Sequence, residues 1–102
     1  MMKFEDYKPY LSPVFYKQTD LIAKSAKGCY LTDINGETYL DFVQGIAVNA
    51  LGHNYPTVVK AIQDQAANLV NASFNLVNYE STLTLAKELA SVTPEGLTSI
   101  FF

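Results

Sequence analysis

The chain has 102 residues, a formal net charge of −3 and a hydrophobic share of 49%. A chain of this length forms one domain at most, and one this apolar can offset the entropy of ordering, so disorder is not expected. All seven basic residues are lysines and they form no stripe, so binding to nucleic-acid phosphates is not expected either.

Membrane insertion and a disulfide framework are also disfavoured. The longest apolar runs are a few residues long, far below the roughly 20 residues that span a bilayer. Residues 1–10 are polar and charged and contain no signal-peptide core. Cys29 is the only cysteine, so no intrachain disulfide can form. These features predict a cytoplasmic protein without membrane contact.

The first part of the chain, residues 1–27, is expected to be an irregular leader. Pro9 and Pro13 interrupt it, and residues 14–26 are too mixed in character to assign to a helix or a strand. We place the start of the folded segment after this leader, so the segment covers residues 28–102.

Residues 28–42 are predicted to form a β-hairpin. Asn35 and Gly36 both tolerate the positive φ that the centre of a type I′ turn requires. A two-residue loop at these positions places Leu31 opposite Leu40 on one face of the ladder, as a period of two requires.

The width of this turn decides which side chains share a face. In the two-residue arrangement Cys29 lies opposite Phe42, and we expect it to be a small packed side chain. A wider turn over residues 33–36 would shift the register and exchange the two faces. Both turn widths stay open at this point.

A loop over residues 45–54 is expected to lead into a first helix. Pro56 suits the first turn of a helix, because its missing N–H would lack a partner there in any case. Apolar residues continue at helical spacing, and the helix is predicted to end near Asn71.

A second helix is predicted over residues 79–92, with Asn78 as its N-cap and Pro94 beyond its end. The last residues, 97–102, read as the beginning of a strand, and the chain is expected to be truncated there. From the residues alone, the fold class is α+β, with an antiparallel hairpin and two helices.

Candidate catalytic side chains are few. His53 is the only histidine and has no carboxylate adjacent in sequence, so we favour a role in orienting its loop over general-base chemistry. His53 and Cys29 are too few for a zinc site, and no metal is expected. Asp33 and Asp41 are expected to stabilise the turn and the strand end, not to act as a catalytic pair. The glycines form no phosphate-binding motif.

Several stretches, taken together in order, resemble the N-terminal part of class III aminotransferases. They are residues 31–42, Gly45-Ile46-Ala47-Val48, Leu51-Gly52-His53-Asn54-Tyr55-Pro56, residues 74–81 and residues 83–89. The resemblance covers residues 28–102. Within the family, the chain is most similar to 4-aminobutyrate aminotransferases, because Val77 stands where acetylornithine and ornithine aminotransferases more often have aromatic residues.

The resemblance implies a homodimeric enzyme of PLP fold type I. Such enzymes use pyridoxal 5′-phosphate to move an amino group from an ω-amine donor, such as 4-aminobutyrate, to a 2-oxo acid, and the cofactor supplies the electron sink. The cofactor lysine, the acidic partner of the pyridine nitrogen and the phosphate-binding loop lie further along the family's chain. The resemblance therefore implies no catalytic or cofactor-binding residue here, and a fragment that is inactive alone and binds no cofactor.

Two residues are expected to contact substrate by their match to the family. Ile46 matches a position that lines the substrate pocket in the 4-aminobutyrate enzymes, and Asn75 matches a pocket-edge position where those enzymes often have glutamine. His53 matches the family's Gly-His, but Tyr55 replaces the histidine that usually follows two residues later. The alternatives are a fragment of an acetylornithine or ornithine aminotransferase, or a non-catalytic interaction module derived from one.

Overall fold

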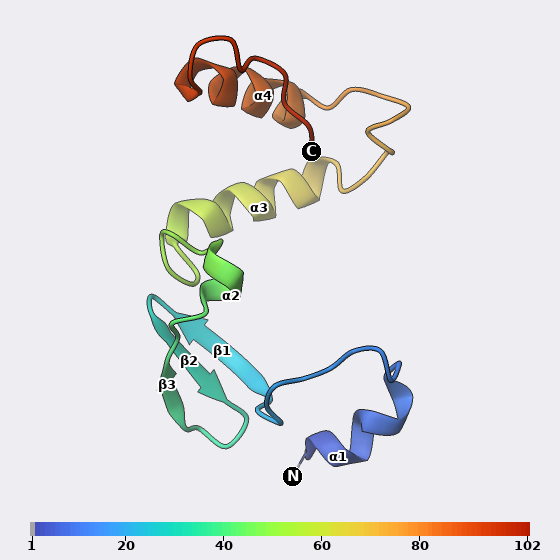
Figure 1. Cartoon of the computed structure of the whole chain (residues 1–102), viewed down its shortest axis with the longest axis vertical. Coiled ribbons are helices and arrows are strands. Elements are labelled where there is room, and N and C mark those ends of the chain that lie inside the picture. The colour runs from blue at the N-terminus through green and yellow to red at the C-terminus, as the bar shows by residue number, and fades with distance from the viewer. Residues whose placement is uncertain (1) are drawn as a thin grey trace. The chain divides into compact units, whose positions relative to one another are not determined.

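The computed structural model describes residues 2–102 (Figure 1). The chain divides into two units, one ending at Gln63 and one covering Asp64–Phe102, and each is described by itself. None of the helices in residues 2–102 has the length and apolar character that a bilayer crossing requires. The elements are α1 (Phe4–Tyr7), the 3₁₀ helix η1 (Lys8–Tyr10), β1 (Ala23–Lys27), β2 (Tyr30–Asp33), β3 (Thr38–Leu40), α2 (Gln44–Ala47), α3 (Pro56–Asn68) and α4 (Glu80–Val92).

The first unit contains an antiparallel sheet in the order β1-β2-β3. In β1, Ala26 lies opposite Leu31 of β2, and the register shifts between Ala23 and Ser25. The prediction of an irregular leader is therefore wrong for β1. The strand contains no β-branched or aromatic residue, the types that indicate a strand in a sequence. It is held by backbone pairing with β2. The division between a leader and a folded segment after residue 27 stays a prediction.

The hairpin is confirmed, but its two-residue turn is wrong. Tyr30 lies opposite Leu40 and Leu31 opposite Tyr39, so the wider turn sets the register. The Asp33 N–H donates to the Glu37 carbonyl at 2.9 Å, which closes a three-residue loop. The free thiol of Cys29 is exposed, which corrects the expectation that it is packed.

The Asp33 side chain explains the wider turn. Its carboxylate accepts hydrogen bonds from the backbone N–H groups of Asn35 at 2.8 Å and Glu37 at 2.9 Å. Gly36 follows with a φ of +91°, a conformation that glycine adopts without steric cost. Burial raises the pKa of Asp33, but the hydrogen bonds from Glu37, Asn35 and Gly36 outweigh it, and the pKa is lowered overall. Asp33 thus stabilises the turn, as predicted.

Both predicted helices are present. The first begins at Pro56, as expected, but ends at Asn68 and not near Asn71. The second, α4, ends at Val92 as predicted. Its N-cap is Tyr79, in an extended conformation and without a capping side chain, so the prediction of Asn78 as N-cap is wrong.

The predicted strand over residues 97–102 is not formed. Its start is held instead by a turn, in which the Leu97 N–H donates to the Pro94 carbonyl at 3.1 Å and the Thr93 hydroxyl donates to the Leu97 carbonyl at 2.5 Å. A strand needs a neighbouring strand for its backbone groups, and the part of the second unit that the structure describes contains none.

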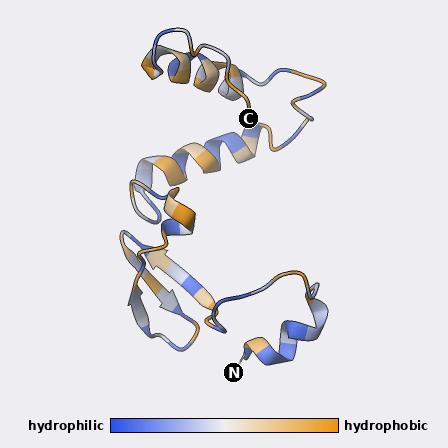
Figure 2. Ribbon diagram, viewed as in Figure 1, coloured by the Kyte–Doolittle hydropathy of each residue, from blue (hydrophilic) through white to orange (hydrophobic). Residues whose placement is uncertain are grey.

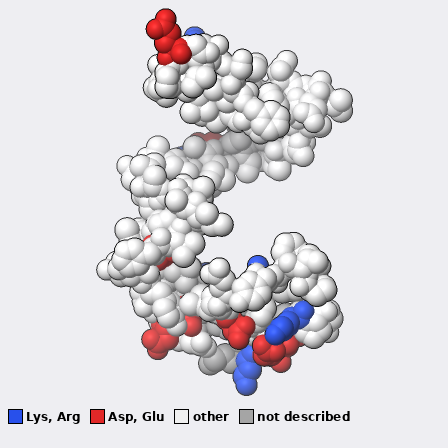
Figure 3. All heavy atoms as spheres, in the orientation of Figure 1, with Lys and Arg blue, Asp and Glu red and all other residues white. Residues whose placement is uncertain are grey.

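Within residues 2–102, no hydrophobic side chain is fully buried. The ribbon coloured by hydropathy shows apolar positions alternating with polar ones along α3 and α4 (Figure 2). Several of these apolar side chains are exposed, including Ile62 at 63% in α3 and Leu83 at 52% in α4. Uncharged groups also cover most of the visible face of each unit (Figure 3). The helices therefore carry apolar stripes that this segment does not cover.

Candidate functional site

The loop that follows β3 begins with an unusual left-handed backbone. Gln44, Gly45, Ile46 and Ala47 of α2 have φ values of 50°, 64°, 66° and 62°. This conformation costs about 1–2 kcal/mol for each non-glycine residue. For a β-branched residue such as Ile46 it is a genuine outlier. Such strain persists only where the surroundings fix the backbone, and it is concentrated at binding and catalytic sites.

Asp41 holds the start of this left-handed turn. Its Oδ1 accepts hydrogen bonds from the backbone N–H groups of Val43 at 2.9 Å and Gln44 at 3.0 Å. In return, the Gln44 side-chain Nε2 donates to the Asp41 carbonyl oxygen at 2.7 Å. The reciprocal arrangement resembles the capping box of a helix start, with a side chain at each end satisfying a backbone group at the other.

The second carboxylate oxygen of Asp41 contacts the imidazole of His53. The distance from Oδ2 to Nε2 is 2.7 Å, and the two side chains are only 12% and 19% exposed. The other ring nitrogen, Nδ1, lies 3.5 Å from the Asn49 side-chain nitrogen. A proton on Nε2 is donated to Asp41 Oδ2, and the Asn49 side-chain nitrogen lies beside Nδ1.

The Asp41–His53 contact also changes the acidity of the carboxylate. The hydrogen bond from His53 lowers the pKa of Asp41, helped by the backbone N–H groups of Gln44 and Val43, and these effects exceed the opposing effect of burial. Because both nitrogens of His53 face partners within the loop, the ring orients the loop, in agreement with the predicted role. The partner itself was missed, because it lies twelve residues away in sequence.

The end of the loop is attached to the turn between β1 and β2. The His53 N–H donates to the Gly28 carbonyl at 2.8 Å, and the Gly28 N–H donates to the His53 carbonyl at 3.0 Å. A Cβ on Gly52 would lie 3.1 Å from the backbone of Gly28, so only glycine allows this approach. Asn54 adds a side-chain hydrogen bond to the Ala26 carbonyl at 2.6 Å.

A cavity of about 450 Å³ lies beside this loop in the first unit. It is lined by Cys29, Leu40, Asp41, Phe42, Gln44, Ala47, Asn49, Ala50 and Gly52. The Gln44 side-chain oxygen is buried and has no hydrogen-bond partner among the described residues. Ile46 does not line this cavity, and its side chain is 85% exposed.

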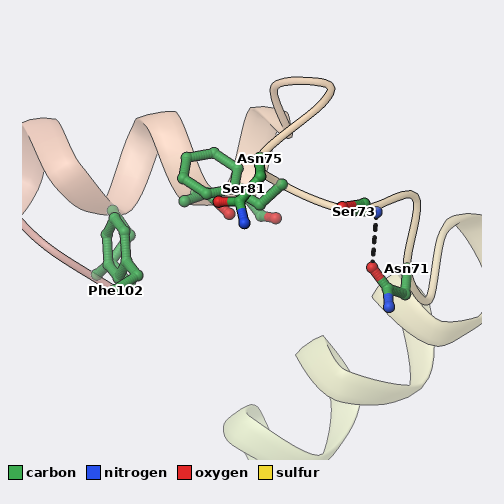
Figure 4. Close-up of a pocket in the computed structure, with 8 residues that line it drawn as sticks. Asn71, Ser73, Asn75, Ser81 and Phe102 are labelled. Carbon is green, nitrogen blue, oxygen red and sulfur yellow. Dashed lines mark hydrogen bonds between the residues drawn. The ribbon is translucent and has the colours of Figure 1, made fainter.

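Asn75 lines a different pocket, in the second unit (Figure 4). Its volume is about 520 Å³, and its walls are Asn71, Ser73, Phe74, Asn75, Ser81, Thr82, Leu85 and Phe102. Phe74 contacts the rings of Tyr79 and Phe102 edge-on, with centroids 5.8 and 6.3 Å apart. Ser73 has a φ of 61°, and its N–H donates to Asn71 Oδ1 at 2.8 Å.

The two predicted substrate contacts therefore fall in different units. Ile46 belongs to the unit that ends at Gln63, and Asn75 belongs to Asp64–Phe102. Asn75 lies in the wall of a pocket, as a substrate contact would. The assignment of both residues to one substrate site stays a prediction.

Both pockets lack one of the groups that pyridoxal phosphate requires. The cofactor is held covalently by a lysine, and its phosphate is held by several donors. No lysine lines the cavity beside the loop or the pocket around Asn75. Residues 2–102 also contain no cluster of three or more His, Cys, Asp or Glu side chains suited to a metal ion. These two pockets therefore offer no lysine for a covalent bond to the cofactor.

Known proteins of one enzyme family share this sequence pattern and this arrangement of loop, sheet and helices. The family model described as aminotransferase class III matches residues 11–102. An acetylornithine aminotransferase of Methanosarcina acetivorans is 47% identical over 87 residues, which cover 85% of this chain and 21% of that protein. The crystal structure of adenosylmethionine-8-amino-7-oxononanoate aminotransferase from Methanocaldococcus jannaschii is 29% identical, with a TM-score of 0.81 over 94% of this chain and 23% of that one.

A third relative has the same fold. N-acetylornithine aminotransferase from Stenotrophomonas maltophilia is 34% identical, with a TM-score of 0.67 over 80% of this chain and 22% of that one. The chain belongs to the class III aminotransferase family, and its α+β architecture is that of the N-terminal segment of these PLP fold-type-I enzymes. It spans about a fifth of the length of the curated relatives it matches, 21% in the Methanosarcina protein.

Proposed function

We propose that the protein carrying this chain transfers an amino group from an ω-amine donor to a 2-oxo acid with pyridoxal phosphate, and that this chain supplies part of the wall of its substrate pocket. The observation that carries the proposal is the strained left-handed turn at Ile46, fixed by Asp41 and His53. Strained backbone conformations cluster at ligand-binding and active sites, and this supports a binding role for the exposed apolar side chain of Ile46.

The first candidate for the amine donor is N-acetylornithine. Relatives that carry the name acetylornithine aminotransferase reach 47% identity to this chain. The second candidate is 4-aminobutyrate, which Val77 favours because the acetylornithine and ornithine enzymes more often have an aromatic residue there. Both donors present an unbranched methylene chain, and the exposed aliphatic side chain of Ile46 suits such a chain.

The cofactor and the reacting atoms would be held by residues outside this chain. The cofactor supplies the electron sink for amino transfer when it is bound, and the residues described here contribute only to the shape of the donor pocket. We further propose that the whole protein is a homodimer in the cytoplasm. The uncovered apolar stripes of α3 and α4 suit burial against further domains and a second subunit.

An assay of the protein carrying this chain tests both donors. The protein is incubated with pyridoxal phosphate, a 2-oxo acid such as 2-oxoglutarate, and either N-acetylornithine or 4-aminobutyrate. We expect transfer from both, with the larger kcat/KM for N-acetylornithine. A larger kcat/KM for 4-aminobutyrate would reverse the order of the donors, and transfer from neither ω-amine would favour the non-catalytic interaction module.

The place of Ile46 is tested by changing it to tyrosine. A bulky side chain with a hydroxyl in a methyl-lined wall changes discrimination between two substrates by roughly 10- to 200-fold. We expect Ile46→Tyr to shift the ratio of kcat/KM values for the two donors by about tenfold or more. Val14→Tyr serves as the matched control, because Val14 is also aliphatic and 83% exposed. An unchanged ratio in the Ile46 variant would remove this residue from the donor pocket.

A further inference from the structure

The loop over residues 41–53 is fixed to the sheet at both ends by main-chain hydrogen bonds. At its start, the Asp41 N–H donates to the Cys29 carbonyl at 2.8 Å. At its end, His53 exchanges two backbone hydrogen bonds with Gly28. None of these bonds uses a side-chain atom, so we expect substitutions at residues 41 and 53 to leave the ends of the loop in place.

The left-handed turn inside the loop depends on side chains instead. The N–H groups of Val43 and Gln44 donate to a single carboxylate oxygen, Oδ1 of Asp41. The other oxygen of the same carboxylate is held by His53 at 2.7 Å. A carboxylate is planar and rigid, so the hydrogen bond from His53 to one oxygen fixes the direction in which the other oxygen faces the turn.

We propose that Asp41 and His53 are positioning residues, a pair that keeps Gln44–Ala47 in its left-handed conformation and thereby directs Ile46 toward the amine donor. The part that concerns the donor rests on the function proposed above. The pair does not touch the reacting atoms. His53 acts through Asp41, Asp41 acts through the backbone of Val43 and Gln44, and the backbone sets the direction of the Ile46 side chain.

Two substitutions separate the hydrogen bond of His53 from its bulk. His53→Phe keeps a ring of similar size and removes the N–H donor. His53→Gln removes the ring and keeps an N–H donor at a similar distance from the backbone. If the hydrogen bond to Asp41 positions the turn, the glutamine variant retains the behaviour of the parent protein and the phenylalanine variant does not. If the ring matters only for packing, the order is reversed.

Hydrogen exchange, measured by mass spectrometry on the protein carrying this chain, reports how well the backbone amides of the turn are protected. In His53→Phe, we expect the amides of Val43, Gln44, Ala47 and Val48 to exchange about tenfold faster, as the loss of one hydrogen bond predicts. His53→Gln should exchange like the parent, and the amides of α4 should be unchanged in both variants. Unchanged exchange in His53→Phe would overturn the proposal, and so would equally fast exchange in both variants or faster exchange throughout α4.

Steady-state kinetics then separate this inference from the proposed function. We expect His53→Phe to raise KM for the amine donor about tenfold with a smaller change in kcat, and His53→Gln to restore KM. A parent protein with no aminotransferase activity would defeat the proposed function while the exchange data still decide whether the pair holds the turn. An active parent whose phenylalanine variant keeps its KM would defeat the positioning role alone.

Discussion

Asp33 shows how one side chain selects between two turns of the same sequence. Its carboxylate accepts hydrogen bonds from the N–H groups of Asn35 and Glu37, and Asp33 is the one residue below a tenth exposed, at 5%, within the part of the chain that the structure describes. Replacing it with alanine leaves those donors without their acceptor. We expect Asp33→Ala to lower the free energy of unfolding of the hairpin by about 1–3 kcal/mol.

Local hydrogen exchange of the hairpin amides in the protein that carries the chain measures this loss. Asp20→Ala is the matched control, since Asp20 is an exposed aspartate outside the turn. Equal protection of the hairpin in the two variants would show that the carboxylate of Asp33 does not determine the turn.

The stability of the loop should depend on pH through the carboxylate of Asp41. Its pKa is lowered in the folded protein by the hydrogen bond from His53 and by the N–H groups of Gln44 and Val43. A lowered folded pKa stabilises the fold fully above the unfolded value of about 3.9, and the contribution is lost as pH falls through the folded pKa. We therefore expect exchange of the Val43 and Gln44 amides, corrected for its intrinsic pH dependence, to accelerate as pH falls below about 4.

The acid effect is checked with Asp41→Asn, which cannot titrate at this position. In that variant, the protection of the two amides should be lower at neutral pH and flat through the acid range. An acid dependence as steep as that of the parent would assign the effect to another group.

Among the structural elements, the loop after β3 contains two positions, Ala47 and Gly52, at which substitution should change the melting temperature in opposite directions. Ala47 has a φ of 62°, which costs an alanine about 1–2 kcal/mol and a glycine almost nothing. Against this, glycine makes the unfolded chain more flexible by about 0.4–1 kcal/mol. Ala47→Gly should therefore raise the melting temperature slightly.

Gly52→Ala should lower the melting temperature. The residue has a φ of +81°, and an added Cβ would lie 3.1 Å from Gly28. The expected loss exceeds 1 kcal/mol, because strain and backbone crowding act together. Calorimetry on both variants of the protein carrying this chain measures the two melting temperatures. If both temperatures changed in the same direction, the backbone of this loop would not be strained as described.

Elements that depend on local pattern were predictable from the sequence. The start of α3 at Pro56, the body of α4 and the position of the hairpin at Asn35-Gly36 follow from helical spacing and turn chemistry. The strand β1 was not predictable, because the sequence Ala-Lys-Ser-Ala-Lys has no alternation of apolar and polar residues. Its formation depends on a partner strand, and the absence of a strand over residues 97–102 depends on the lack of one in the described part of the second unit.

For the candidate site, the sequence suggested individual residues but none of the contacts between them, and the substrate-binding roles of Ile46 and Asn75 stay predictions. Ile46 and Asn75 were identified by resemblance, and His53 by its position in the loop. The contact between Asp41 and His53 was not identified, because no periodic pattern links residues twelve apart across a loop. The left-handed backbone at Ile46 was hidden for the same reason, since isoleucine is among the residues least suited to positive φ.

Considered as a whole, the 102-residue chain is expected to bind no cofactor by itself. The family resemblance matches none of the seven lysines of this chain to the cofactor lysine, so the 102-residue chain alone should not retain pyridoxal phosphate. The chain is incubated with the cofactor and dialysed, and its visible absorption spectrum is recorded. We expect no band from bound cofactor after dialysis. A stable band that disappears on substitution of one particular lysine would place a cofactor site within this chain.

These residues form a segment of a larger aminotransferase fold and do not enclose a hydrophobic core of their own. No hydrophobic side chain in residues 2–102 is fully buried, and Phe101 and Phe102 are 100% and 52% exposed. Large uncovered apolar surfaces drive association in water. Replacing both phenylalanines with serine should reduce that association, and the same change at the exposed Tyr10 and Tyr16 serves as the control.

Sedimentation velocity of the 102-residue chain shows whether the segment encloses a core. We predict a sedimentation coefficient that rises with concentration in the micromolar range, and a smaller rise in the Phe101→Ser, Phe102→Ser variant than in the tyrosine control. A single monomeric species at every concentration, together with a cooperative thermal transition, would show instead that the segment encloses its own core.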